Sequence, residues 1–406
     1  MRAVKFQSKV ALFYLLIAAI LGVLLRLFPF SDFNANFRFI VHTHSHIALL
    51  GWAYIALTTI LYKIGIPNEK KEAYNVLFWS SQTTIIGMLF SFPFVGYALY
   101  SILFSTLFIL CTYWFYYFFR KHNNLDKKAL SYKFITTSLL FLIVSSLGPW
   151  LLGVIMNTVG NGSHWYKNAI YFYLHFQYNG WFLFCLIGLL FYIVEKQEIN
   201  FPITIARRFY QLFTISCILT LFLCFLWIKP KLLIFIVAGF GAVLQCISFL
   251  LFYKSIKKTA HTLKKWFGHF NFKVLQFILG MFFIKILLQL FSALPYFAEI
   301  TYAYIDFVIG YLHLVFLGII TPTILIFLKY LQLLLVPKIW IKLYLIGFVV
   351  SEMLLFYKGI TIWQQKEYLE NYAVYLLLIS SLLPISILGV FLKNLKKLPF
   401  SEGSYQ

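Results

Sequence analysis

Long apolar stretches separated by short polar loops run through the whole chain. A helix needs about 20 mainly apolar residues to cross the hydrocarbon core of a bilayer, and about twelve stretches meet this length. None alternates as a transmembrane β-strand does, and no internal repeat is obvious. The pattern predicts an all-α polytopic membrane protein with a single transmembrane domain over residues 1–406. The expected spans are 10–29, 39–62, 74–94, 96–119, 132–157, 166–194, 205–228, 231–253, 273–294, 302–328, 338–357 and 371–392.

Two features bear on this count of spans. The first stretch is too long for a signal peptide and lacks a small-residue cleavage site, so we interpret it as a span. The third and fourth spans are separated only by the short segment 93–96, which makes this division the weakest in the series.

The basic residues are concentrated in every second loop. Lys and Arg follow the even-numbered spans and precede the first, while the intervening loops carry few of them. Because cytoplasmic loops are enriched in Lys and Arg, this alternation predicts that both termini lie in the cytoplasm. The net charge of +22 is therefore a topology signal and does not indicate nucleic-acid binding.

The composition supports a membrane location. Of the 406 residues, 62% are hydrophobic and 11% are charged, whereas soluble domains carry roughly 25% charged residues. We therefore expect the lipid bilayer as the main partner. All five cysteines lie in apolar stretches without a C-x-x-C pair, which predicts small buried side chains and neither disulfides nor a thiolate metal site.

Five histidines lie inside three of the apolar stretches. His42, His44 and His46 begin the second span, His175 lies in the sixth and His313 in the tenth. These three spans run in the same direction, and a rise of 1.5 Å per residue places His175 and His313 roughly 15 Å deep. All five imidazoles are thus predicted in the outer half of the membrane, where a buried polar ring needs a partner.

The spacing of the first three histidines leaves their roles open. His42 and His46 share a helix face, while His44 points about 200° away from His42. A metal chelated by His42 and His46 needs one helix, whereas a haem with two histidine ligands needs two helices. Neutral imidazole suits either, and interfacial rings bonded to water or backbone remain the simpler alternative.

Other polar residues also lie within predicted spans. Lys285 and Gln289 are one turn apart in the ninth span, and an intramembrane lysine is a candidate functional residue. Glu352 in the eleventh span and Asp306 at the start of the tenth are possible partners of Lys285. We predict a proton or ion path at Lys285, Gln289 and Glu352, with a structurally paired lysine as the alternative.

The chain resembles subunit I of the haem-copper oxidase superfamily, which includes nitric oxide reductases. The likeness lies in about twelve spans, cytoplasmic termini and histidines on spans 2, 6 and 10. Arg38 followed by His42-Thr43 resembles the span 2 pattern of nitric oxide reductases, and His44-Ser45-His46 with Gly51 resembles the related NnrS family. The resemblance implies the fold of that subunit in a bacterial inner (cytoplasmic) membrane.

The resemblance also implies cofactors. His42 or His44 together with His313 would ligate a low-spin haem b. His175, with His46, would bind copper or a second haem, and Asn179 stands where nitric oxide reductases carry a glutamate. An electron donor or a partner subunit is then expected.

The chain departs from the family pattern at the second metal. The predicted span 7 has no histidine, and the span 10 pair is reduced to His313, with Tyr311 at the other position. We therefore expect a degenerate or absent copper centre. The favoured function is haem-based electron transfer or gas sensing, and any enzymatic activity would be that of an oxidoreductase of the terminal oxidase or nitric oxide reductase type.

Two other functions remain open from the sequence. One is a metal or small-molecule transporter, with the three clustered histidines as an outward-facing collecting site and Lys285 in the path. The other is a membrane scaffold or assembly protein without a cofactor. Optical spectra of the purified protein distinguish these possibilities from a haem protein.

Overall fold

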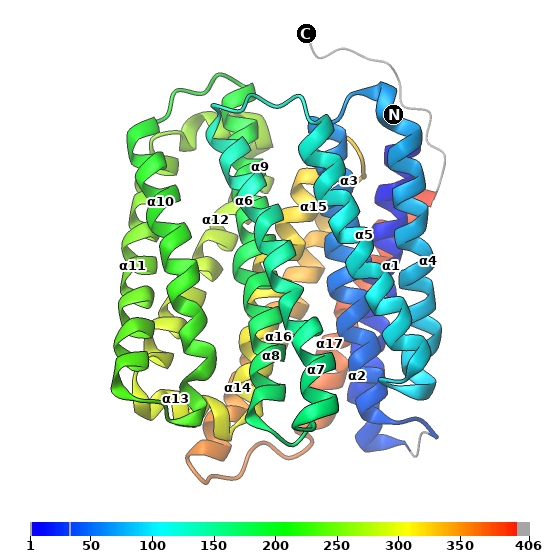
Figure 1. The fold of residues 1–406 in the computed structure, drawn as a ribbon, viewed down its shortest axis with the longest axis vertical. Coiled ribbons are helices and arrows are strands. Elements are labelled where there is room, and N and C mark those ends of the chain that lie inside the picture. Colours follow the sequence, from blue (N-terminus) through cyan, green and yellow to red (C-terminus); the bar gives the residue numbers. More distant parts are fainter. Residues whose placement is uncertain (1, 32–33, 396–406) are drawn as a thin grey trace.

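Long helices running side by side form the whole described protein (Figure 1). The computed structural model describes residues 2–31 and 34–395, and this part contains helices and no strand. Eleven of its helical segments are long and apolar enough to cross a membrane. A further long helix, α4 (Lys71–Val95), packs against α5 (Leu99–His122) and α2 (Phe37–His46). The predicted all-α polytopic membrane fold is confirmed.

Three composite helices lie inside the bundle. In their apolar windows 89%, 89% and 78% of residues are buried, against 28% to 39% in the others. Each inner helix passes through a π-helical segment. The first is α2 (Phe37–His46), η2 (Ile47–Tyr54) and α3 (Ile55–Gly65); the second is α8 (His164–His175), η4 (Phe176–Phe182) and α9 (Leu183–Lys196); the third is α14 (Ile305–Val315), η6 (Phe316–Ile320) and α15 (Thr321–Tyr330).

The remaining helices surround these three. Neighbouring pairs in this outer layer include α4 with α5, α10 with α11 and α16 with α17, and α17 packs on α1 and so links the two ends of the chain. The outer helices are α1 (Arg2–Leu27), α4 (Lys71–Val95), α5 (Leu99–His122), α6 (Leu130–Ser145), α7 (Leu147–Thr158), α10 (Ile203–Leu219), α11 (Leu232–Lys257), α12 (Ala260–Ser292), α16 (Lys338–Trp363) and α17 (Tyr372–Leu395).

Several boundaries differ from those expected from hydropathy. The stretch 132–157 is divided at Ser146 into α6 and α7. α12 begins at Ala260 because a polar turn of helix joins it across Gly268, whose φ of 75° interrupts regular geometry. A short helix, α13 (Pro295–Ala303), precedes α14. Hydropathy detects only the apolar part of a helix, so it misses polar extensions and kinks.

The weakest predicted division, between the third and fourth spans, coincides with a sharp turn. α4 ends at Val95, and Gly96 follows with φ of 58°, a conformation that favours glycine. A β-carbon at Gly96 would also collide with the Phe39 ring. This turn brings α4 and α5 side by side.

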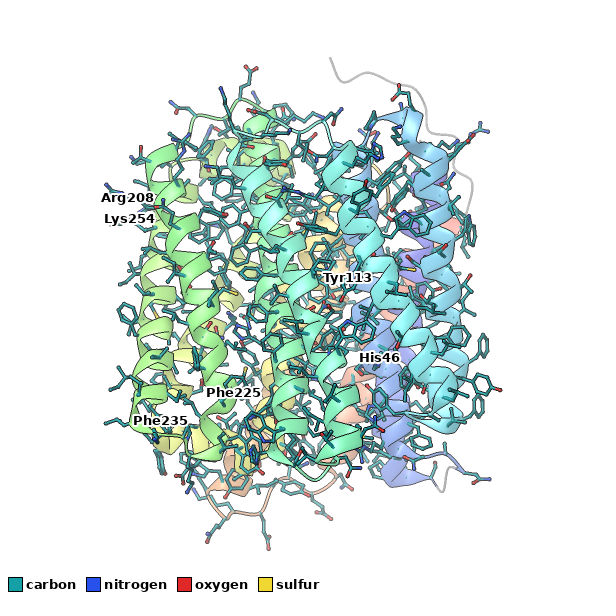
Figure 2. All side chains as sticks on the ribbon, viewed as in Figure 1. His46, Tyr113, Arg208, Phe225, Phe235 and Lys254 are labelled. Atoms are coloured by element: carbon teal, nitrogen blue, oxygen red, sulfur yellow. The ribbon has the colours of Figure 1, made fainter. Side chains whose placement is uncertain are left out.

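The two ends of the bundle differ in character. In Figure 2, Arg208 and Lys254 lie toward the end that holds the N-terminal part of α1, whereas His46 lies in the opposite half. A short 3-10 segment, η5 (Thr220–Ile228), continues α10 into this histidine half. The candidate site is therefore in the half of the bundle away from the most basic loops.

Candidate functional site

A histidine followed five residues later by glycine recurs in all three inner helices. The pairs are His46 with Gly51, His175 with Gly180 and His313 with Gly318. η2 and η4 begin directly after their histidines, and η6 contains its glycine. This repeat was not obvious from the apolar pattern, but the H-x4-G spacing on spans 2, 6 and 10 could have revealed it.

The three glycines have the same packing role. A β-carbon built on Gly51 would lie 2.9 Å from Tyr14, one on Gly180 2.6 Å from Phe141, and one on Gly318 2.6 Å from Phe348. An aromatic residue from an outer helix therefore presses onto the inner backbone at each π segment.

The inner helices touch one another at the same level. Trp52 Nε1 donates a 3.1 Å hydrogen bond to Thr321 Oγ1, which links η2 to α15. Tyr54 and Trp181 have ring centroids 6.4 Å apart, which joins η2 to η4. The ring centroids of Tyr178 and Phe316 lie 6.1 Å apart, which joins η4 to η6. All three histidine-bearing spans are therefore neighbours near the middle of the bundle.

His44 turns toward α1. Its Nδ1 lies 2.8 Å from the carbonyl oxygen of Ala18. Because a carbonyl only accepts, Nδ1 must carry the proton, and the lone pair of neutral imidazole is then on Nε2. The ring is half-buried on an inner helix, and no hydrogen-bond partner for Nε2 occurs in residues 2–31 or 34–395.

His313 has the same arrangement on the third inner helix. Its Nδ1 bonds the carbonyl oxygen of Ile309 at 2.9 Å, which again leaves the lone pair on Nε2. The ring is half-buried and lies within electrostatic range of His44 and Arg26. Spans 2 and 10 thus place two similarly held imidazoles within electrostatic range of each other. A carbonyl bond at one nitrogen is the usual support for a histidine that ligates metal through the other.

One charged residue, Arg26, is within electrostatic range of both rings, and Glu352 is within range of Arg26. The Arg26 guanidinium on α1 is within electrostatic range of His44, His313 and the Glu352 carboxylate on α16. Both carboxylate oxygens of Glu352 are buried without a hydrogen-bond partner in the described chain. Glu352 is therefore a partner of Arg26 by charge rather than by contact.

His42 and His46 face a different group of residues. The His46 Nδ1 bonds the carbonyl oxygen of His42 at 2.8 Å, and its Nε2 receives a long 3.5 Å contact from the Tyr97 hydroxyl. The ring centroid of His42 lies 4.7 Å from that of Tyr97, and that of His46 lies 4.4 Å from that of Phe92. The three clustered histidines therefore divide between two environments.

His175 is held between the second inner helix and span 7. Its Nε2 lies 2.8 Å from the carbonyl oxygen of Cys217. Its Nδ1 lies 3.4 Å from Asn179 Nδ2 and 3.9 Å from Cys224 Sγ. No spacing in the sequence associates the cysteines of span 7 with His175, because only the folded chain brings them together.

The two residues of the predicted metal pair have different neighbours. His46 contacts Tyr97 and Phe92, while His175 contacts Cys217, Asn179 and Cys224. Across residues 2–31 and 34–395, no group of three or more His, Cys, Asp or Glu side chains is placed to hold a metal ion.

The polar residues assigned to an ion path lie in two places. Lys285 is fully buried, its Nζ has no hydrogen-bond partner among the described residues, and it lies 5.8 Å from the ring centroid of Phe282. Gln289, one turn away, also has an unpaired buried oxygen. The expected partners of Lys285 are engaged elsewhere, since Glu352 faces Arg26 and Asp306 bonds Lys358 at 3.1 Å.

A cavity of about 510 Å³ opens next to His175. Its walls come from α8, η4, η5, α12, α13, α14 and α16. Most lining residues are apolar or aromatic, and the polar ones include His175, Asn179, Cys224, Gln289 and Tyr311. Its size and mixed lining are those of a small-molecule site.

Comparison of the sequence with protein-family models and with curated proteins found no match.

Proposed function

We propose that the protein is a b-type haem protein of the membrane, with His44 and His313 as the two axial ligands. The observation that carries this proposal is the matched state of the two rings. Each Nδ1 is bonded to a backbone carbonyl, and each Nε2 lone pair is left for another partner. Two helices are needed to place ligands on both faces of a haem, and these rings come from two.

The surroundings fit the group that the proposal requires. Haem carries two carboxylates, and Arg26 supplies a cation within electrostatic range of both rings. Gly22 lies against the His44 ring, since a β-carbon there would be 3.1 Å from Cε1. Gly310 lies similarly against Glu352 and Phe356.

The role we assign is respiratory electron transfer or gas sensing. A bound haem would supply the redox chemistry, while the protein holds the ligands and limits water. The resemblance to the haem-copper oxidase superfamily supports this role. On the same ground we propose that the protein lies in a bacterial inner membrane with cytoplasmic termini, and that it works with an electron donor or a partner subunit. His175, alone or with His46, remains our candidate for copper or a second haem.

Optical spectra test the haem directly. Protein purified in mild detergent should show a Soret band and a sharp α band on reduction. His44→Ala and His313→Ala should each remove the low-spin α band. His42→Ala is the matched control, because this ring is also half-buried in α2 but packs on Tyr97, so its spectrum should match the parent.

Other results would overturn the proposal. Colourless protein that binds copper or zinc would favour a transporter, and colourless protein without metal would favour a scaffold. If His42→Ala abolished the α band and His44→Ala left it unchanged, the ligand assignment would be wrong although a haem was present. Elution of each variant as a folded monodisperse species excludes simple misfolding.

A further inference from the structure

The cavity beside His175 has a polar inner wall with unused hydrogen-bonding capacity. Asn179 and Gln289 both line it, are 4% and 6% exposed, and each carries a side-chain oxygen without a hydrogen-bond partner among the described residues. The Tyr311 hydroxyl is also at the wall and lies beside the Asn179 side chain. Unpaired buried acceptors cost free energy, and a ligand that donates hydrogen bonds would satisfy them.

The orientation of the Asn179 amide follows from its neighbour. His175 donates from Nε2 to the Cys217 carbonyl, so its Nδ1 accepts, and the Asn179 Nδ2 group points toward that nitrogen at 3.4 Å. The Asn179 oxygen is therefore the atom that remains unpaired. A ligand hydroxyl at this wall would have an acceptor in the Asn179 oxygen.

The outer part of the cavity is aromatic. Trp227, Phe291, Phe297, Tyr302, Phe307 and Trp363 contribute to the walls. Phe291 and Tyr302 are 49% and 45% exposed, so the aromatic part reaches the surface of the bundle. Aromatic side chains pack well against aromatic ligands, and an apolar tail extending past Phe291 and Tyr302 would enter lipid.

We propose that this cavity binds a membrane-soluble phenolic amphiphile, a molecule with an aromatic ring, a hydroxyl group and an apolar tail. The hydroxyl donates to the Asn179 or Gln289 oxygen, while Tyr311 offers a further hydroxyl partner. The ring lies among the aromatic walls. About 510 Å³ accommodates a substituted ring and the start of a tail. The inference does not depend on a haem.

A pair of matched probes tests the hydroxyl requirement. 4-Octylphenol and its methyl ether, 4-octylanisole, have the same ring and tail, but only the phenol donates a hydrogen bond. Binding is measured by equilibrium dialysis between lipid nanodiscs that hold the full chain and empty nanodiscs, which corrects for partition into lipid. The phenol should bind about tenfold more tightly, as expected for one well-made hydrogen bond. 1-Dodecanol, which donates without an aromatic ring, should bind more weakly than the phenol.

Variants locate the interaction. Asn179→Leu and Gln289→Leu should together bring the affinity for the phenol to within twofold of that for the ether. Gln276→Leu is the matched control, because Gln276 is also on α12 but faces a different cavity, and it should keep the preference. Ser292→Phe should weaken binding of both probes by filling the cavity. Because this variant leaves the polar wall intact, it still tests the location of the site if Asn179→Leu does not fold.

Three results would overturn the inference. They are equal affinity for phenol and ether, tighter binding of dodecanol than of phenol, and an unchanged preference in the folded Asn179 and Gln289 variants. Spectra of the same samples keep this test separate from the haem proposal. A Soret band without phenol selectivity rejects only the cavity ligand, and selectivity without a Soret band rejects only the haem.

Discussion

Trp52 donates a 3.1 Å hydrogen bond from its indole N–H to the Thr321 hydroxyl. Trp52 lies eight residues after His44, and Thr321 lies eight residues after His313, the other candidate haem ligand. The two helices run in the same direction, so equal separations along them place the two imidazoles at similar depth. This buried hydrogen bond therefore fixes the relative position of the two helices along their axes, and with it the depth of the two proposed ligands.

Removing this hydrogen bond should destabilise the fold and the proposed ligand pair together. We expect Trp52→Phe or Thr321→Val to lower the free energy of unfolding by about 1–3 kcal/mol, because each leaves one buried polar group unpaired. The double variant should lose less than the sum of the two single losses. Thermal unfolding in detergent measures both. Strictly additive losses would show that the two side chains act independently.

Gly22 should be sensitive to any side chain. A β-carbon there would lie 3.1 Å from His44 Cε1, so Gly22→Leu should displace the ring and remove at least half of the α-band amplitude. Gly280 is the control, since a β-carbon there meets nothing within 4 Å. Gly280→Leu should leave the spectrum unchanged and stabilise α12 by up to about 1 kcal/mol. Equal spectra for both variants would place the His44 ring elsewhere.

Arg26 and Glu352 should be coupled. The two side chains are within electrostatic range of each other inside the bundle, although Glu352 has no hydrogen-bond partner among the described residues, so each should be less stable in the bundle without the other. Arg26→Leu and Glu352→Leu should each lower the thermal midpoint, and the double variant should be more stable than either single one. As a control, Glu299→Gln breaks the exposed pair with Lys229 and should change stability by less than about 1 kcal/mol. A double variant less stable than both singles would contradict the coupling.

The buried amine of Lys285 should lower the free energy of unfolding of the protein. The amine is buried without a hydrogen-bond partner among the described residues, and methionine has a similar length without the polar group. Lys285→Met should raise the free energy of unfolding by about 1–3 kcal/mol, the usual cost of an unpaired buried group. Lys273→Met, on the exposed surface of the same helix, should have little effect. A marked loss of stability in Lys285→Met would indicate a partner for the amine.

The orientation of the bundle can be measured in intact cells. We expect the loops carrying most Lys and Arg to lie in the cytoplasm. A membrane-impermeant maleimide added outside the inner membrane should label Glu370→Cys and not Asp126→Cys; both positions are exposed, at opposite ends of the bundle. Lysed cells should show labelling at both positions. The reverse pattern in intact cells would invert the predicted topology.

Hydropathy was sufficient for the fold class because a bilayer leaves the backbone few ways to satisfy its hydrogen bonds. It does not record which helices are central. The three inner spans are distinguished by polar and small residues, such as Gly51 and Gly180, rather than by their apolar content. The kink at Gly268 and the break at Ser146 depend on local geometry that an apolar average does not resolve.

The candidate site was predicted only in part. Helical spacing separated His44 from His42 and His46, but the choice between the two faces required the position of Ala18 on a neighbouring helix. Cys217 and Cys224 are ordinary apolar positions until span 7 packs on His175. Contacts between distant segments are set by packing, and a single sequence does not encode them in a readable pattern.

Beyond their π segments, the three inner helices have no means of absorbing a change in length. A π turn accommodates one residue more than the α-helix around it, but deleting one residue of α2, outside η2, would rotate everything beyond it by about 100°. Trp52 would then turn away from Thr321, and the Gly51 backbone would no longer meet Tyr14. Among homologues, single-residue insertions and deletions should therefore accumulate in the outer layer and its loops, while the inner helices keep a constant residue count.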